Sequence, residues 1–351
     1  MLENLLKELI SINSSDKDGA NEAVAYCGHW LEGHGLPVHI IENNGYKMLV
    51  SEIGSGNETI VWNGHVDVVS GKEDQFIPVE VKDKIYGRGA ADMKAGVAAM
   101  MCAFKELKDA PLGVKLQLQI VSDEEIGGFN CSGYLAEHGY RGDFVICSEP
   151  TQLGIALQAK GVMRLEIAIE GDPAHGSRPW EGINAIERAY EVHGKLKELP
   201  FAKESSEFYP SPSINLAKIR GGDVYNKVPE KCELFYDIRY LPGQDKDEII
   251  KQIESITDGE VLVSMFSKPL QTARDNPFIL KLKPVVDRHI EDEAVFFGQH
   301  GSADTVFFAN YGIPAIEFGP SGLHWHGDKE YVLPESVHVY KEMLVDFAES
   351  F

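Results

Sequence analysis

The sequence has 351 residues, enough for one large domain and a smaller one. A hydrophobic fraction of 43% and a charged fraction of 25% are typical of a folded globular protein and exclude wholesale disorder. The formal net charge of −22 at pH 7 argues against a nucleic-acid partner, because a phosphate backbone would be repelled.

The cysteine pattern and the N-terminal residues indicate the cellular compartment in which the protein is expected. Five scattered cysteines without a C-x-x-C pair indicate reduced thiols, with neither a disulfide framework nor a thiolate zinc site. Residues 1–10 carry acids among apolar residues, which predicts an amphipathic helix and differs from a signal peptide. No apolar stretch approaches the roughly 20 residues that a membrane span requires. We therefore expect a cytoplasmic protein without a membrane partner.

The first 150 residues alternate between helical and strand patterns. Strands that alternate with helices of crossover length predict an α/β fold with a mixed, mainly parallel sheet. The elements expected here are helices at about 18–34, 94–108 and 128–139, and strands at 37–41, 59–62, 114–121 and 144–147.

The order of predicted helices and strands changes from about residue 160. The order β-α-β-β-α-β over about 110 residues predicts a ferredoxin-like α+β module inserted into the first domain. Its expected elements are strands at 162–169, 213–220, 231–240 and 261–266, and helices at about 182–198 and 245–256. Helix–strand alternation then resumes, so we expect a main domain of 1–158 and 269–351 and an inserted domain of 159–268.

Acids and histidine follow the predicted strands at the points where the strands end. In an open α/β sheet this is the edge where ligands bind. Buried carboxylates repel one another, and a divalent cation would relieve that conflict. Imidazole and carboxylate ligands without a thiolate suit zinc, with cobalt or manganese as alternatives. The residues are His65 and Asp67, Asp92, Glu124 and Glu125, and Glu149.

Each of these signals has an ordinary structural explanation when it is taken alone. His65 could be a core histidine bonded to Asp67, Asp92 could cap a helix, and adjacent glutamates often begin a solvated helix. Their order along the chain and their shared position at strand ends favour a common site.

That order of motifs resembles a known family. The motifs are Gly64-His-Val-Asp67, Gly87-Arg-Gly-Ala-Ala-Asp92-Met-Lys, Glu124-Glu125, Ser148-Glu-Pro150, Ala174-His-Gly-Ser-Arg-Pro179 and Gly319-Pro-Ser-Gly-Leu-His-Trp-His326-Gly-Asp-Lys-Glu330. Together they are similar to the zinc metallopeptidase family of acetylornithine deacetylase, succinyl-diaminopimelate desuccinylase, aminoacylase and bacterial glutamate carboxypeptidase. The resemblance covers essentially the whole chain.

The resemblance implies a role for each of these residues. Asp92 would bridge two zinc ions. His65 and Glu149 would complete one metal site, and Glu125 and His326 the other. His326 is preferred to His324 as the ligand because the family places a Glu four residues later, where Glu330 stands.

The resemblance also implies the catalytic groups. Glu124 would be the general base, and Asp67 would accept a hydrogen bond from the free ring nitrogen of His65. His175 would stabilise the oxyanion together with a metal ion.

The substrate contacts come from the same resemblance. Arg239 and Asn226 match positions that contact the substrate, and Lys160 stands where the desuccinylase has Arg. The segment that begins Gly301-Ser302 resembles a desuccinylase motif whose Arg would fall on Val306. The missing cation disfavours succinyl-diaminopimelate and favours a small acyl group such as acetyl.

The function predicted is hydrolysis of the amide bond of an N-acyl amino acid. A dipeptidase or carboxypeptidase of the same family is the alternative, whereas the intact Glu124 and ligand set speak against a non-catalytic metal-binding protein. The resemblance also implies a homodimer through the inserted domain, in which His175 completes the partner's active site. The short insertion contains no second copy of itself that could replace a partner within one chain.

Overall fold

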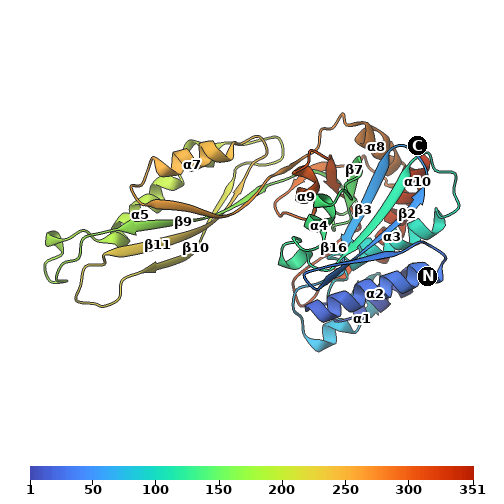
Figure 1. The fold of residues 1–351 in the computed structure, drawn as a ribbon, viewed down its shortest axis with the longest axis horizontal. Coiled ribbons are helices and arrows are strands. Elements are labelled where there is room, and N and C mark those ends of the chain that lie inside the picture. Colours follow the sequence, from blue (N-terminus) through green and yellow to red (C-terminus); the bar gives the residue numbers. More distant parts are fainter. The chain divides into compact units, whose positions relative to one another are not determined.

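The computed structural model describes residues 1–351, which form two units (Figure 1). The first unit contains residues 1–157, 271–297 and 303–351, and the second contains residues 158–270 and 298–302. The sequence places the boundaries after residues 158 and 268, so the structure differs chiefly in grouping residues 298–302 with the second unit.

The first unit is built on a nine-stranded sheet. Four adjacent strands, β6, β3, β7 and β15, run parallel, and β2 and β1 continue the sheet antiparallel at one edge. The mixed, mainly parallel sheet predicted from the sequence is therefore confirmed. Its strands are β1 (His39–Asn43), β2 (Tyr46–Gly54), β3 (Thr59–His65), β6 (Lys115–Val121), β7 (Phe144–Cys147), β8 (Ile155–Ala159), β13 (Leu270–Gln271), β14 (Phe296–Gln299) and β15 (Ala315–Glu317).

Helices cover both faces of this sheet, as two neighbouring residues of β3 illustrate. Trp62 points to one face, where its ring lies 6.2 Å from that of Phe104 in α3. Asn63 points to the other face and donates to Ser132 of α4 over 3.1 Å. Burial on both faces explains why even the polar side chains of the central strands, Gln117 and Gln119 of β6 and Asn63 of β3, are buried. The helices are α1 (Leu2–Ser11), α2 (Lys17–Gly33), α3 (Lys94–Glu106), α4 (Ser132–Glu137), α8 (Pro277–His289), α9 (Thr305–Ala309) and α10 (Pro334–Glu349).

A small second sheet in this unit has no counterpart in the predicted elements. Its strands follow the order β16-β17-β5-β4 and join the loop before Asp92 to the loop around His326. The strands are β4 (Val79–Val81), β5 (Lys84–Tyr86), β16 (Gly322–Leu323) and β17 (Tyr331–Val332), and short 3-10 turns lie at Glu73–Phe76 and Glu124–Ile126. None of the helices has the length and apolar character to cross a membrane.

The second unit has the ferredoxin-like arrangement predicted from the sequence. Four antiparallel strands follow the order β10-β11-β9-β12, and α5 and α7 lie on one face of the sheet (Figure 1). Ile167 of β9, Leu234 of β11 and Ile253 of α7 belong to the core between these layers. The elements are β9 (Gly161–Glu170), a 3-10 turn at Pro179–Glu181, α5 (Ala185–Leu196), α6 (Pro200–Lys203), β10 (Ser213–Gly221), β11 (Lys231–Tyr240), α7 (Lys246–Glu254) and β12 (Glu260–Ser267).

Lys94 is a fully buried cation at the start of α3. Its Nζ donates to the main-chain carbonyls of Leu9 and Ile12 over 2.9 and 3.0 Å, which satisfies carbonyl groups at the end of α1. Burial lowers the pKa of Lys94 from 10.5 to about 7. The unfolded chain therefore binds one more proton than the folded chain between about pH 7 and pH 10.5.

The free energy of unfolding that Lys94 contributes should consequently rise as the pH increases through this window. We expect the free energy of unfolding of wild type, relative to that of Lys94→Met, to rise by on the order of 1 to 2 kcal/mol from pH 7 to pH 9, measured by urea unfolding. Lys105→Met, on the same helix but only partly buried, is the control and should show no such change. A difference for Lys94→Met that does not depend on pH would contradict the assignment.

Candidate metal centre

Three neighbouring parallel strands bring the predicted ligands to one edge of the main sheet. His65 is the last residue of β3, Glu124 and Glu125 follow the end of β6, and Glu149 follows the end of β7. These strands are adjacent in the order β6-β3-β7, so their carboxyl ends meet. Asp92 joins them from the loop before α3.

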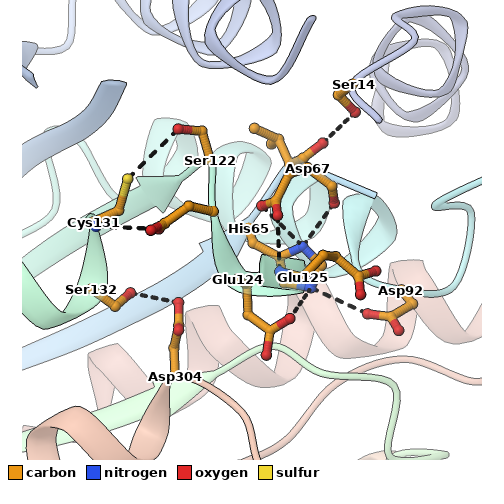
Figure 2. A network of polar contacts seen from close by, with 12 residues as sticks. Ser14, His65, Asp67, Asp92, Ser122, Glu124, Glu125, Cys131, Ser132 and Asp304 are labelled. Atoms are coloured by element: carbon orange, nitrogen blue, oxygen red, sulfur yellow. Dashed lines mark hydrogen bonds and ion pairs between the residues drawn. The ribbon is translucent and has the colours of Figure 1, made fainter. Parts of the chain in front are cut away.

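The ring of His65 is held by a main-chain acceptor. Its Nδ1 lies 2.9 Å from the carbonyl oxygen of Asp67, and a carbonyl can only accept, so Nδ1 carries the proton. The lone pair of Nε2 is then free to bind a metal. Figure 2 shows the carboxylates of Asp92 and Glu124 directed toward this ring.

The acceptor that Asp67 offers to the His65 ring is its main-chain carbonyl and not its carboxylate. Oδ1 of Asp67 lies 3.6 Å from Nδ1, too far for a hydrogen bond. Oδ2 instead accepts from the main-chain amide of Glu125 over 2.9 Å. Asp67 thus fixes His65 with its carbonyl and the Glu124–Glu125 turn with its carboxylate.

Asp92 lies between two sets of possible ligand atoms. Its Oδ1 is 3.2 Å from Nε2 of His65, which is 3.8 Å from Oε1 of Glu149. Its Oδ2 is 3.2 Å from Nε2 of His326, which is also 3.2 Å from Oε2 of Glu125. Zinc bonds of about 2.0 Å in a tetrahedron place ligand atoms roughly 3.3 Å apart, so both sets fit a zinc-sized cation.

The structure brings His326 rather than His324 to this position. His324 is absent from both sets, and its ring lies 5.9 Å from that of Tyr331. Both histidines have a positive φ, 63° at His326 and 62° at His324, a conformation that histidine adopts more readily than most residues.

The electrostatics of the centre are unfavourable without a cation. Burial, together with the charge of Asp92, raises the pKa of Glu149 well above its usual range, and burial raises that of Glu124 in the same way. Hydrogen bonds to Asp92 and Glu125 raise the pKa of His326 to about 10. The acids and the imidazole therefore hold protons that compete with a metal, and a divalent cation would relieve the repulsion among the carboxylates.

Metal binding at pH 7 should for this reason release protons. His326 holds a proton in the metal-free site that it must lose to act as a ligand, and burial raises the pKa of Glu149 so that this carboxylate also competes for a proton. We expect a net release of protons on saturation with zinc, measured by calorimetry in buffers of different ionisation enthalpy. Binding heats that do not depend on the buffer would contradict this description.

Asp304 is a buried acid beside the centre whose position the sequence does not reveal. Its Oδ2 accepts from the hydroxyl of Ser132 over 2.5 Å, and burial raises its pKa to about 8 (Figure 2). Its Oδ1 lies against Gly128, where a Cβ would come within 2.1 Å and φ is +69°. The signals in the sequence are the Gly127-Gly128 pair after the glutamates and the place of Asp304 in the segment that begins Gly301-Ser302.

The remaining predicted site residues lie in the second unit. His175 and Asn226 are neighbours there, because the carbonyl of Asn226 accepts from the amide of Gly176 over 2.8 Å. Nδ1 of His175 accepts from the amide of Ser177, so the neutral ring carries its proton on the free Nε2. His175 and Asn226 are both exposed.

The other predicted substrate contacts in this unit differ in exposure. Arg239 is partly exposed and donates from Nε to Asp237 over 2.7 Å. Gly301 is exposed and Ser302 half-buried. Lys160 is only 3% exposed, and its Nζ donates to the carbonyl of Ser211 over 2.8 Å, so it lies in the interior of the unit.

Comparisons with known proteins identify relatives of nearly the whole chain. A model of the family described as Peptidase family M20/M25/M40 matches residues 61–350. The acetylornithine deacetylase of Proteus mirabilis (strain HI4320) is 28% identical over 364 residues, covering 97% of this chain and 93% of the relative.

Solved structures have the same fold. Aminopeptidase PepT from Bacillus cereus ATCC 10987 has a TM-score of 0.85 at 21% identity, covering 99% of this chain and 97% of that one. The Bacillus subtilis YXEP protein, a dinuclear metal-binding peptidase from the M20 family, has a TM-score of 0.72 at 16% identity, covering 99% and 96%.

The family match spans most of the chain, and the resemblance inferred from the motifs is confirmed. The family and its deacetylase relatives identify a metal-dependent hydrolase of amide bonds. The chain belongs to the M20/M25/M40 family of metallopeptidases.

Proposed function

We propose that this protein is a two-zinc deacylase that hydrolyses the amide bond of an N-acyl amino acid. The observation that carries the proposal is the position of Asp92, whose two carboxylate oxygens each lie 3.2 Å from a histidine of a different ligand set. His65 and Glu149 would complete one zinc site with Asp92, and Glu125 and His326 the other.

The two cations, when bound, would polarise the amide carbonyl and make the attacking water more acidic. Glu124 then acts as the general base: it removes a proton from this water as the oxygen adds to the carbonyl carbon. When the C–N bond breaks, Glu124 returns the proton to the departing amine, leaving a carboxylic acid and an amine, which exchange the acid proton to give a carboxylate and an ammonium. The free Nε2–H of His175 is the proposed donor to the oxyanion.

The acyl group of the proposed substrate is small. The similarity to an acetylornithine deacetylase over nearly the whole chain supports it, as does Val306 at the position of the desuccinylase Arg. We propose Arg239 as the partner of the substrate carboxylate, with Asn226, Gly301 and Ser302 as further contacts.

A dipeptidase or aminopeptidase is the second candidate, because an aminopeptidase is among the solved structures with the same fold. A panel of N-acetyl amino acids, N-succinyl amino acids and dipeptides, assayed with zinc and with cobalt, separates the two. The deacylase proposal expects kcat/KM to be highest for N-acetyl amino acids. Preferential cleavage of dipeptides would overturn it in favour of a peptidase.

We further propose a homodimer through the second unit. Strand β10 is an edge strand of its sheet, with one side of its main chain unpaired. Large apolar side chains of the same unit are exposed, among them Trp180 at 76%, Tyr190 at 79% and Ile219 at 54%. Exposed apolar side chains and an open edge strand in the same unit are features of a protein interface and support this assembly.

A further inference from the structure

A buried ion pair joins the two loops that carry Asp92 and His326. Nη1 of Arg88 lies 2.9 Å from Oε2 of Glu330, and the two side chains are 3% and 1% exposed. Arg88 precedes Asp92 by four residues, and Glu330 follows His326 by four. Neither residue belongs to a ligand set.

Glu330 holds the main chain that leads to Asp92. Its Oε1 accepts from the amides of Ala91 and Asp92 over 3.0 and 3.1 Å, and its Oε2 accepts from the amide of Gly89 over 3.0 Å. The last of these three amides belongs to Asp92, the residue shared by both ligand sets. A carboxylate that receives three amides and a guanidinium has no acceptor capacity left for other partners.

Arg88 holds the main chain of the other loop. Its Nη2 lies 3.4 Å from the carbonyl oxygen of His326 and 3.4 Å from that of Ser70. The planar guanidinium thus contacts Glu330 with one terminal nitrogen and the His326 loop with the other. A lysine ammonium carries a single nitrogen and cannot occupy both places.

A general contribution to stability is the ordinary explanation of a buried ion pair, but these contacts are more selective than that. Each of them ends on the main chain of a ligand loop or on the other member of the pair, apart from the contact with Ser70. Residues 87–93 and 324–330 contain no helix or strand that would fix the ligand positions by itself.

We propose that Arg88 and Glu330 are positioning residues that set the separation of Asp92 and His326 and so determine the affinity of the cation sites. The proposal rests on the two-cation function proposed above. Glu330 acts on Asp92, which serves both sites, whereas Arg88 acts on His326, which serves one. The two residues should therefore have different effects on the two sites.

A cobalt titration of the full chain, followed by calorimetry, tests this difference. Variants Glu149→Ala and Glu125→Ala assign the two binding phases to their ligand sets. Arg88→Lys, which keeps the positive charge, should weaken the Glu125–His326 site about ten- to a hundredfold and change the His65–Glu149 site by less than about threefold. Glu330→Asp, which keeps the negative charge but retracts the carboxylate, should weaken both sites at least about tenfold.

Asp328→Asn is the matched control for both variants. Asp328 lies in the same loop as His326 and pairs with Lys72 over 2.5 Å. Both side chains of this pair are exposed, and the pair does not join the two ligand loops. It should leave both affinities unchanged. Equal weakening by Arg88→Lys and Asp328→Asn, or unchanged affinities in Arg88→Lys and Glu330→Asp, would overturn the proposal.

Amide hydrogen exchange in metal-free protein tests the positioning without any cation. The amides of Ala91 and Asp92 should be protected in wild type and should exchange at least about tenfold faster in Glu330→Asp, with no change in Asp328→Asn. Unprotected amides in wild type, or unchanged exchange in Glu330→Asp, would overturn the proposal. A wild type that binds fewer than two cations would instead refute the proposed function, while the exchange result still decides the role of Glu330.

Discussion

Replacing Glu124 by Gln should lower kcat by about 10² to 10⁴ and leave the metal content unchanged. Oε2 of Glu124 lies 4.0 Å from Nε2 of His65, close to the centre, yet Glu124 belongs to neither ligand set. Gln has nearly the same shape but cannot accept the proton of the attacking water. The measurements are steady-state kinetics and elemental analysis on the same protein sample.

Glu125→Ala is the matched control, because Glu125 is the next residue and its Oε2 lies 3.2 Å from His326. This variant should lose one of two metal ions per chain. If Glu124→Gln loses metal and Glu125→Ala retains both ions, the two glutamates must exchange roles.

Co-refolding two inactive variants should restore activity if His175 serves the partner's site. Glu124→Ala and His175→Ala should each be inactive alone. In a mixed dimer, one site combines an intact Glu124 with the His175 of the Glu124→Ala subunit, and that site is complete. At equal mixing about half of the dimers are mixed, so about a quarter of wild-type activity should return.

Co-refolding either variant with itself provides the baseline for this experiment. If His175 acts within its own chain, every site in the mixture lacks one group and no activity returns. A monomer with full turnover, measured by light scattering at the assay concentration, would also contradict the shared site.

The positions at strand ends were predictable from the sequence because they follow from the topology. Once β3, β6 and β7 are parallel neighbours, His65, Glu124 and Glu149 must lie at the same edge of the sheet. Short strands separated by helices of crossover length carry this information locally. The same holds for the second unit, whose β-α-β-β-α-β order predicts its sheet.

Features that depend on pairing between distant segments were not predictable in this way. Strands β16 and β17 have two residues each, too short to leave a periodic pattern. The helix expected over 128–139 is reduced to Ser132–Glu137, because the carboxylate of Asp123 binds the amides of Asn130 and Cys131 and holds that segment in a turn.

The partner of the His65 ring also could not be predicted from residue types alone. Asp67 is two residues from His65 and offers both a main-chain carbonyl and a carboxylate as acceptors. Only the backbone conformation between the two residues decides which acceptor the ring meets. The role of Arg88 could not be predicted from its neighbours in the sequence either, because its partner Glu330 lies 242 residues away.

Titrating metal-free protein with zinc tests the central claim most directly. We expect no turnover of an N-acetyl amino acid without metal, and activity that rises with added zinc and is complete at two ions per chain, with cobalt as an effective substitute. Two phases of binding should correspond to the sets that share Asp92. Undiminished turnover by protein shown to be metal-free by elemental analysis would contradict the account.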